Sequence, residues 1–218
     1  MLNFLFGQSR PALGARLNAL RATPASAMGN YTYCLDTPSF RQSTSCSISE
    51  TGDVAGACLL RMTPAPQGGS DYFFPYAGNA SSIAVPANVP SGTIAITTEM
   101  TGCALEVRYQ HQNSTYVFYH DRNGQGMPAL TAQETRVFRM SDSTYWSVAE
   151  QGASWPTSTP TYQFLCVFDG YLWQVGCYCI VRSTGAGSGP SGTVVRLGQS
   201  VMGGHVGFFH RKRSLIFP

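Results

Sequence analysis

The chain has 218 residues, which suits one large domain that can bury most of its apolar surface without disulfides or metals. Charged residues make up only 11%, while glycine (23) and proline (13) are plentiful, so short strands joined by turns are favoured over long exposed helices. The net charge of +3 is too small to indicate a nucleic-acid-binding protein. No run approaches the roughly 18 apolar residues of a membrane span.

The cysteines and lysines bear on the compartment in which the protein works. Seven cysteines in a chain of this length do not fit a secreted disulfide scaffold, so we expect free thiols and a reducing environment. Thirteen arginines accompany a single lysine, Lys212. This bias fits a GC-rich genome first of all; the alternative is a protein that must survive where lysines are sites of ubiquitin attachment.

The N-terminal segment differs in character from the rest of the chain. We predict an extension over residues 1–28 with one amphipathic helix, followed by a single β-sandwich domain over residues 29–218. The extension carries Arg10, Arg16 and Arg21 and no acidic residue. An arginine-rich amphipathic start is typical of a transit peptide or a bacterial secretion signal, and a structural helix remains an equal alternative.

Runs rich in β-branched and aromatic residues between turn residues predict strands. They lie at residues 58–62, 81–86, 92–100, 103–110, 115–121, 135–140 and 144–150, with further candidates towards the C-terminus. The clearest signal is a hairpin over residues 162–181, with Asp169-Gly170 as its turn and both flanks apolar on both faces. We therefore predict a mainly β fold, a β-sandwich or distorted barrel with few peripheral helices.

One predicted hairpin brings a cysteine and a histidine together. Alternation along 103–110 places Cys103 with the apolar set, and the return strand 115–121 ends near His120. A turn at His111-Gln112 would place Cys103 opposite His120, and a turn at Gln112-Asn113 would make it a diagonal neighbour. Both registers put the two side chains on one face. His111 lies eight residues from Cys103 along one strand and is too distant to be its base.

A cysteine beside a histidine is the arrangement that nucleophilic catalysis by a thiol requires. A free thiol is mostly protonated at neutral pH; a neighbouring imidazolium stabilises the thiolate, and the imidazole can later protonate a leaving amine. Gly102 allows the backbone N–H groups of Gly102 and Cys103 to face a substrate oxygen as an oxyanion hole. Read from the pattern alone, a core thiol near an edge histidine is the alternative.

The segment Met100-Thr101-Gly102-Cys103, with a strand, a turn and a strand ending in His120, resembles the catalytic core of the cytotoxic necrotizing factor toxins and the related Burkholderia lethal factor. Those proteins carry an L-S-G-C motif, so methionine replaces leucine and threonine replaces serine here. The resemblance covers about 25 residues. It implies a β-sandwich in which Cys103 and His120 deamidate a glutamine of a host protein. It also implies that an oxygen from a nearby strand orients His120; Thr97 is our candidate, with Thr98 and Thr101 equally close.

These expectations define a bacterial toxin or effector that is secreted and delivered to the host cytosol. The resemblance suggests a Rho-type GTPase or a translation-initiation helicase as the host protein substrate. We expect a monomer that needs no cofactor. We also expect no metal site, because the spacing of His205 and His210 suits no metal triad. The alternatives are a non-catalytic β-sandwich binding module, such as a carbohydrate-recognising domain, and a cysteine hydrolase of the same fold acting on a small molecule.

Overall fold

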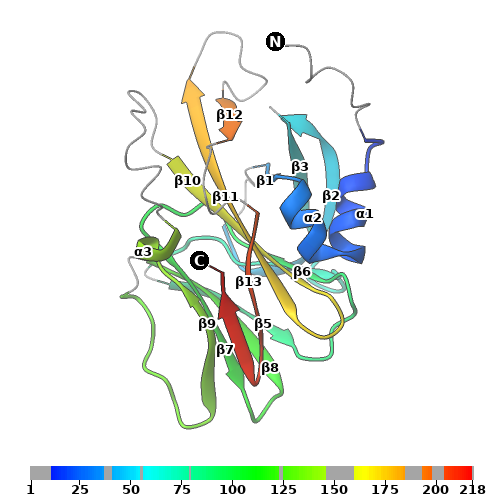
Figure 1. Ribbon diagram of the computed structural model, residues 1–218. Coiled ribbons are helices and arrows are strands. Elements are labelled where there is room, and N and C mark those ends of the chain that lie inside the picture. The colour runs from blue at the N-terminus through cyan, green and yellow to red at the C-terminus, as the bar shows by residue number, and fades with distance from the viewer. Residues whose placement is uncertain are drawn as a thin grey trace.

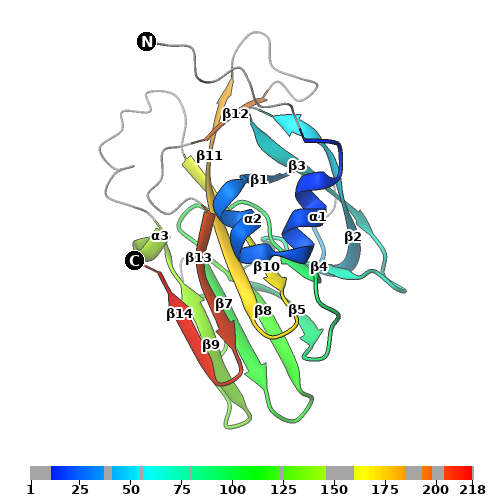
Figure 2. The same ribbon diagram turned by 45° about the vertical axis from the view of Figure 1, so that its right-hand side comes forward.

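The structure, a computed structural model, describes residues 11–36, 41–54, 56–78, 80–122, 125–145, 160–184, 193–197 and 204–217. Most of these residues form strands in two sheets, which confirms the mainly β prediction (Figures 1 and 2). The helices are short: α1 (Ala15–Ala22), α2 (Pro24–Asn30) and α3 (Asp142–Tyr145). Within the described part of the chain, none has the length and apolarity needed to cross a membrane.

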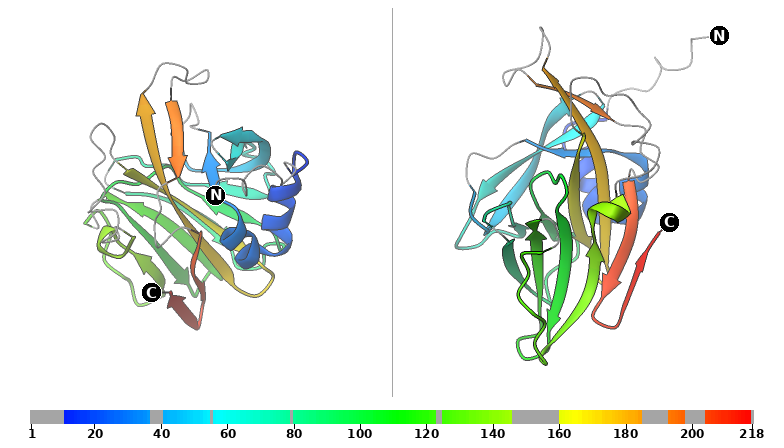
Figure 3. Two further views of the ribbon diagram at one scale, coloured as in Figure 1. Left: turned by 45° about the horizontal axis from the view of Figure 1, so that its top comes forward. Right: turned by 90° about the vertical axis from the view of Figure 1, so that its left-hand side faces the viewer.

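The larger sheet has ten strands in the order β1-β3-β2-β4-β6-β10-β11-β13-β14, with β12 pairing with β11 off this path. Its strands are β1 (Tyr33–Leu35), β2 (Thr44–Val54), β3 (Ala57–Pro64), β4 (Asp71–Phe73), β6 (Ile94–Ile96), β10 (Pro160–Phe168), β11 (Trp173–Thr184), β12 (Thr193–Leu197), β13 (Gly204–His210) and β14 (Arg213–Ile216). Figure 3 shows β11 and β12 extending beyond the two N-terminal helices. The sheet thus joins segments from both ends of the chain.

The smaller sheet has four antiparallel strands in the order β5-β8-β7-β9. Their bounds are β5 (Ala80–Pro86), β7 (Ala104–Gln110), β8 (Thr115–Asp121) and β9 (Glu134–Met140). In the β7–β8 hairpin, Leu105 pairs with His120 and Gln110 pairs with Thr115. Of the two registers that the sequence left open, the structure therefore has the one with its turn centred on Gln112-Asn113.

Strand β10 separates two hydrophobic cores. Phe164, Cys166 and Phe168 pack towards the smaller sheet, while Leu165 and Val167 belong to the core beneath α1 and α2. All five are buried. Residues 162–168 and 173–180 of the predicted apolar hairpin are buried, and β10 is covered on both faces, as the composition predicts.

Two arginines tie the N-terminal helices to the larger sheet. Arg16 is 7% exposed and donates to Glu50 Oε1 at 3.0 Å and Asp53 Oδ2 at 2.6 Å. Arg21 forms a two-pronged pair with buried Asp71, at 2.8 and 2.7 Å. Such bidentate pairs fix geometry as well as charge. Arg16 and Arg21, which resemble part of a targeting signal in the sequence, therefore make specific contacts with the larger sheet. The boundary predicted at residue 28 falls inside helix α2.

Three predicted elements differ in the structure. The predicted strand at 144–150 begins instead in helix α3, because Asp142 Oδ1 accepts the Ser143 N–H and the Tyr145 N–H turns back to Ser141 O; residues 146–150 lie outside the described part. The strand predicted at 92–100 is limited to β6. The turn predicted at Asp169-Gly170 is centred one residue later, since the Asp169 N–H already donates to Leu172 O and Gly170 takes the positive φ of 100°.

A substitution at Gly204 of β13 would test how closely α2 packs against this strand. It has a φ of 103°, and a Cβ there would lie 2.7 Å from Met28 O. We expect Gly204→Ala to lower the free energy of unfolding by about 1–3 kcal/mol, through backbone strain and displacement of α2. Gly29→Ala is the matched control, because a Cβ there meets nothing within 4 Å. The control should be neutral or stabilising by about 0.5–1 kcal/mol. Urea unfolding measures both, and equal stabilities would contradict this packing.

Candidate functional site

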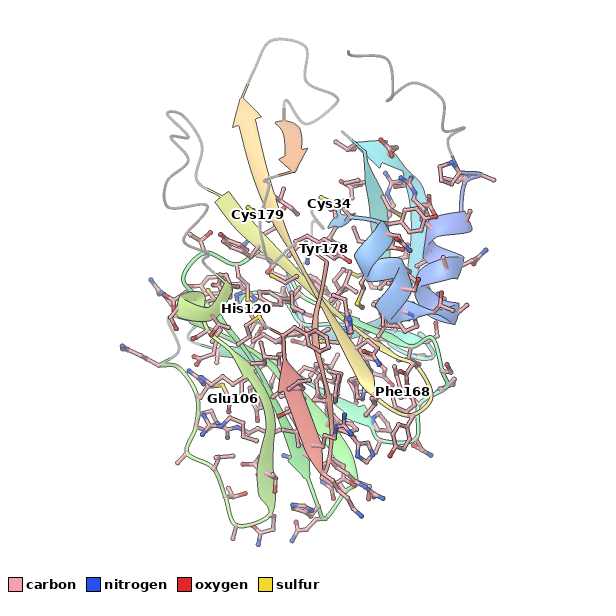
Figure 4. All side chains as sticks on the ribbon, in the orientation of Figure 1. Cys34, Glu106, His120, Phe168, Tyr178 and Cys179 are labelled. Atoms are coloured by element: carbon pink, nitrogen blue, oxygen red, sulfur yellow. The ribbon has the colours of Figure 1, made fainter. Side chains whose placement is uncertain are left out.

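Cys103 and His120 lie on the inner face of the smaller sheet. Cys103 immediately precedes β7 and shares the core with Leu105 and Val107, so its side chain faces the larger sheet. His120 pairs with Leu105, which makes Cys103 its diagonal neighbour. Diagonal Cβ atoms are separated by roughly 7–8 Å or somewhat less, and the Cys103 thiol contacts Thr101 O at 4.0 Å. Figure 4 places His120 near α3, well away from Cys34 beside β1.

Local backbone geometry sets the position of Cys103. Gly102 has a φ of 74°, a left-handed conformation that strains any side chain with a Cβ. The backbone carbonyl of Cys103 is also fixed, because the hydroxyl of Tyr145 in α3 donates a hydrogen bond to Cys103 O at 2.6 Å. Tyr145 is itself buried against Tyr162, with ring centroids 4.6 Å apart. The carbonyl of Cys103 is thus held by a rigid aromatic side chain, while Cys103 as a whole is 8% exposed and lies two residues from exposed Thr101.

A hydrogen-bonded chain connects His120 to the larger sheet. His120 Nδ1 lies 2.7 Å from Thr97 Oγ1, and Thr97 Oγ1 donates to Phe74 O at 2.5 Å. Because the hydroxyl has one proton and gives it to the carbonyl, it must accept the proton on Nδ1. This assigns the Nδ1–H tautomer and leaves the lone pair on Nε2. Nε2 is buried and has no hydrogen-bond partner among the described residues.

The structure also separates Thr97 from the other two candidate threonines. Thr98 Oγ1 accepts the backbone N–H of Tyr76 at 2.9 Å, and Thr101 is exposed. Tyr76 covers the imidazole of His120, with ring centroids 5.4 Å apart. Thr97 is fully buried and directly follows β6, so it projects between the sheets where the imidazole lies. Sequence proximity could not distinguish the three, since only the end of the short strand β6 aims one of them at His120.

Burial sets the charge state of the imidazole. His120 is fully buried, and this lowers its pKa from 6.5 to about 4. Its orienting partner is a neutral hydroxyl, which adds no negative charge to offset the loss of water. At neutral pH the resting state is therefore a neutral imidazole whose Nε2 can accept a proton. This differs from the expectation of an imidazolium that holds a thiolate beside it.

The outer face of the same strand pair carries a buried ionic cluster that the sequence reading missed. Arg108 donates to Glu106 Oε1 at 2.8 Å and to Pro128 O at 2.7 Å, and Arg139 also contacts Glu106. Asp121, next to His120, lies 3.7 Å from Arg139, and burial raises the pKa of its carboxyl. Glu106 and Arg108 alternate with apolar residues and read in sequence as solvent-facing. The segment that contains Pro128 folds back over them and removes them from water.

Comparisons with known proteins leave the site to be judged on its geometry. No protein-family model matches the chain, and no curated protein matches it either. Among the described residues, no group of three or more histidine, cysteine or acidic side chains is placed to hold a metal ion. None of the seven cysteines forms a disulfide.

The lowered pKa of His120 predicts a specific dependence of stability on pH. Above pH 6.5 the imidazole is neutral in both the folded and the unfolded chain. Between pH 6.5 and about 4 the unfolded chain binds a proton that the folded chain does not, so stability falls with pH, by up to about 3 kcal/mol. We expect His120→Gln to remove this contribution, so that its loss of unfolding free energy between pH 7 and pH 4 is smaller by about that amount. Urea unfolding at both pH values measures the difference. Equal losses in the two proteins would show that His120 titrates normally.

Proposed function

We propose that the protein is a cysteine hydrolase that deamidates a glutamine side chain of another protein. The observation that carries this proposal is the tautomer of His120, whose Nδ1–H is engaged by Thr97 while its buried Nε2 is left without a partner on the face shared with Cys103. An unpaired polar atom in the protein interior costs stability. A histidine that served only to join the two sheets would therefore not be expected to keep an unpaired buried Nε2. Nucleophile, base and orienting group are the three parts that thiol catalysis requires.

The reaction follows from these three groups. The Cys103 thiol adds to the glutamine carboxamide carbon while its proton passes to His120 Nε2. The C–N bond then breaks, and His120 gives the proton to the departing ammonia, leaving a thioester. Water attacks the thioester carbon, giving a proton to Nε2; glutamate leaves, and Cys103 regains the proton. Because a buried imidazole with a low pKa is a poor resting cation, deprotonation accompanies C–S bond formation.

Thr97 has a positioning role in this scheme. Its hydroxyl accepts the Nδ1–H throughout, which keeps Nε2 available at the start and orients the imidazolium that forms transiently. The backbone at Gly102 and Cys103 is our candidate for the oxyanion hole, supported by the left-handed turn at Gly102. Tyr145 fixes the carbonyl of Cys103, which limits the directions that the thiol can take.

The substrate class rests on the resemblance of the segment around Cys103 and His120 to the cytotoxic necrotizing factor toxins and Burkholderia lethal factor. That likeness supports a bacterial effector acting on a host protein, with a Rho-type GTPase and a translation-initiation helicase as the two substrates to test. An oxygen from a neighbouring strand that orients the histidine is part of the same pattern, and Thr97 occupies that place here.

The first test uses both candidate substrates. We expect the wild-type protein to convert one glutamine to glutamate in one of them, detected by peptide mass spectrometry, and Cys103→Ala to abolish the conversion. Cys34→Ala is the matched control, because Cys34 is also a buried cysteine and lies away from His120 (Figure 4). A wild-type protein that modifies neither substrate, nor a glutamine-containing peptide or free glutamine, would remove the support for deamidation. Activity on free glutamine alone would favour the small-molecule hydrolase.

The role of Thr97 is tested by removing one hydroxyl. Thr97→Val should lower kcat about tenfold or more with little change in KM, because the tautomer is no longer fixed. The pH profile should shift as well, since Nδ1 loses its partner. Thr98→Val removes a hydroxyl from the adjacent residue, whose partner is Tyr76 N rather than the imidazole. Equal kinetic losses in both variants, with no change in pH profile, would assign Thr97 a purely structural role.

A further inference from the structure

A second candidate site lies at the opposite end of the sandwich from Cys103. Four loops meet around a cavity of about 630 Å³, in the size range of pockets for small ligands. The loops follow β5 and connect β7 to β8, β10 to β11 and β13 to β14. The seven residues of β7 separate the cavity from Cys103 by roughly 23 Å at the usual rise. Figure 4 places Phe168, which lines the cavity, far from His120.

Among the described residues that line this cavity, Arg211 is the one permanent cation and none is a carboxylate. Arg211 is exposed, and its backbone N–H donates to the hydroxyl of Tyr116 at 3.2 Å. Tyr109 also lines the cavity, and hydrogen bonds from Ser114 and then from Arg211 lower the pKa of its hydroxyl. Asp169 is the nearest acidic residue in these turns, and both its oxygens accept hydrogen bonds, from Tyr171 and Leu172 N–H and from Gln174. Among the described residues, Arg211 forms no ion pair.

The rim of the cavity is flat and aromatic. Tyr171 is 72% exposed and stacks on His210, with ring centroids 5.6 Å apart and planes 16° apart. Most of the Tyr171 side chain is in contact with water, so a ligand that stacks on its ring can bury this surface. Asn88, Asn113 and Ser114 add exposed amide and hydroxyl groups around it. These groups donate and accept hydrogen bonds at once, which suits the hydroxyls of a sugar.

We propose that this cavity binds an acidic sugar. The carboxylate would pair with the Arg211 guanidinium, the ring would lie on Tyr171, and the asparagine amides would hold the hydroxyls. A single guanidinium suits one carboxylate, which it can bind through two parallel hydrogen bonds. Lys212 and Arg213 follow in the same turn but do not line the cavity, and Arg213 lies over the ring of Phe208 instead. The cavity therefore lacks the several cations that a polyphosphate would require.

The test titrates the full-length protein with sialyllactose and follows the amide chemical shifts of Asn113, Ser114, Gly170 and Tyr171. Lactose is the matched neutral ligand, and adenosine monophosphate tests a phosphate-bearing ring. We expect saturable shifts at these residues with sialyllactose, and binding of lactose weaker by about tenfold or more because the charge-assisted contact is missing. Arg211→Gln should weaken sialyllactose to the level of lactose, and Tyr171→Ser should weaken both sugars.

Lys212→Gln is the control, because it removes a cation one residue away that does not line the cavity. A loss equal to that of Arg211→Gln would indicate general attraction of anions and overturn the site. Equal affinity for lactose and sialyllactose, shifts centred elsewhere, or tighter binding of adenosine monophosphate would each overturn the acidic-sugar assignment. The proposal is independent of the hydrolase activity, since Cys103→Ala should bind sialyllactose as the wild type does.

Discussion

The candidate site depends on one buried hydrogen bond, from His120 Nδ1 to Thr97 Oγ1. It joins the smaller sheet to the larger one, and its direction is forced by the next link, in which the hydroxyl donates to Phe74 O. A carboxylate in place of Thr97 would stabilise a charged imidazole; a hydroxyl orients the ring without doing so. Burial lowers the pKa of His120, and the hydroxyl adds no charge to offset it, while the same partner leaves Nε2 without a hydrogen bond among the described residues.

The position of β7 against β9 has its origin on the opposite face. Buried ion pairs contribute little net stability, because desolvation offsets the attraction between the charges. They are demanding of geometry, however, and Arg108 must satisfy Glu106, Glu134 and two backbone carbonyls at once. Glu134 and Arg139 lie on β9, so any slip of β7 against β9 would leave several of these charges unpaired. The ionic cluster therefore fixes the register of β7 against β9, while the β7–β8 ladder makes Cys103 and His120 diagonal neighbours.

Much of this arrangement is legible in the sequence, because strand parity is a local property. Alternation along 103–110 and 115–121 was sufficient to place Cys103 and His120 on one face, and the length of the turn then selected between two registers. The sequence pattern does not predict strand β2, because one of its buried positions is the charged residue Glu50. Glu50 is buried only because Arg16 of α1 forms an ion pair with it, and strand periodicity contains no sign of that distant contact. Helix α3 was mistaken for a strand, because its aromatic content outweighed the Ser141-Asp142 capping signal. Both errors arise where a distant or local polar contact overrides the apolar pattern.

The two ends of the β7–β8 hairpin have opposite characters, and this supports two separate roles. At the Cys103 end the chemistry-bearing groups are buried and the imidazole is neutral. At the turn end exposed Tyr171, which stacks on half-buried His210, and exposed Arg211 border a cavity. Catalysis benefits from excluded water, whereas recognition needs groups that a ligand can reach before it binds. A single hairpin can serve both needs because its strands are held rigid along their whole length by packing on one face and charge on the other.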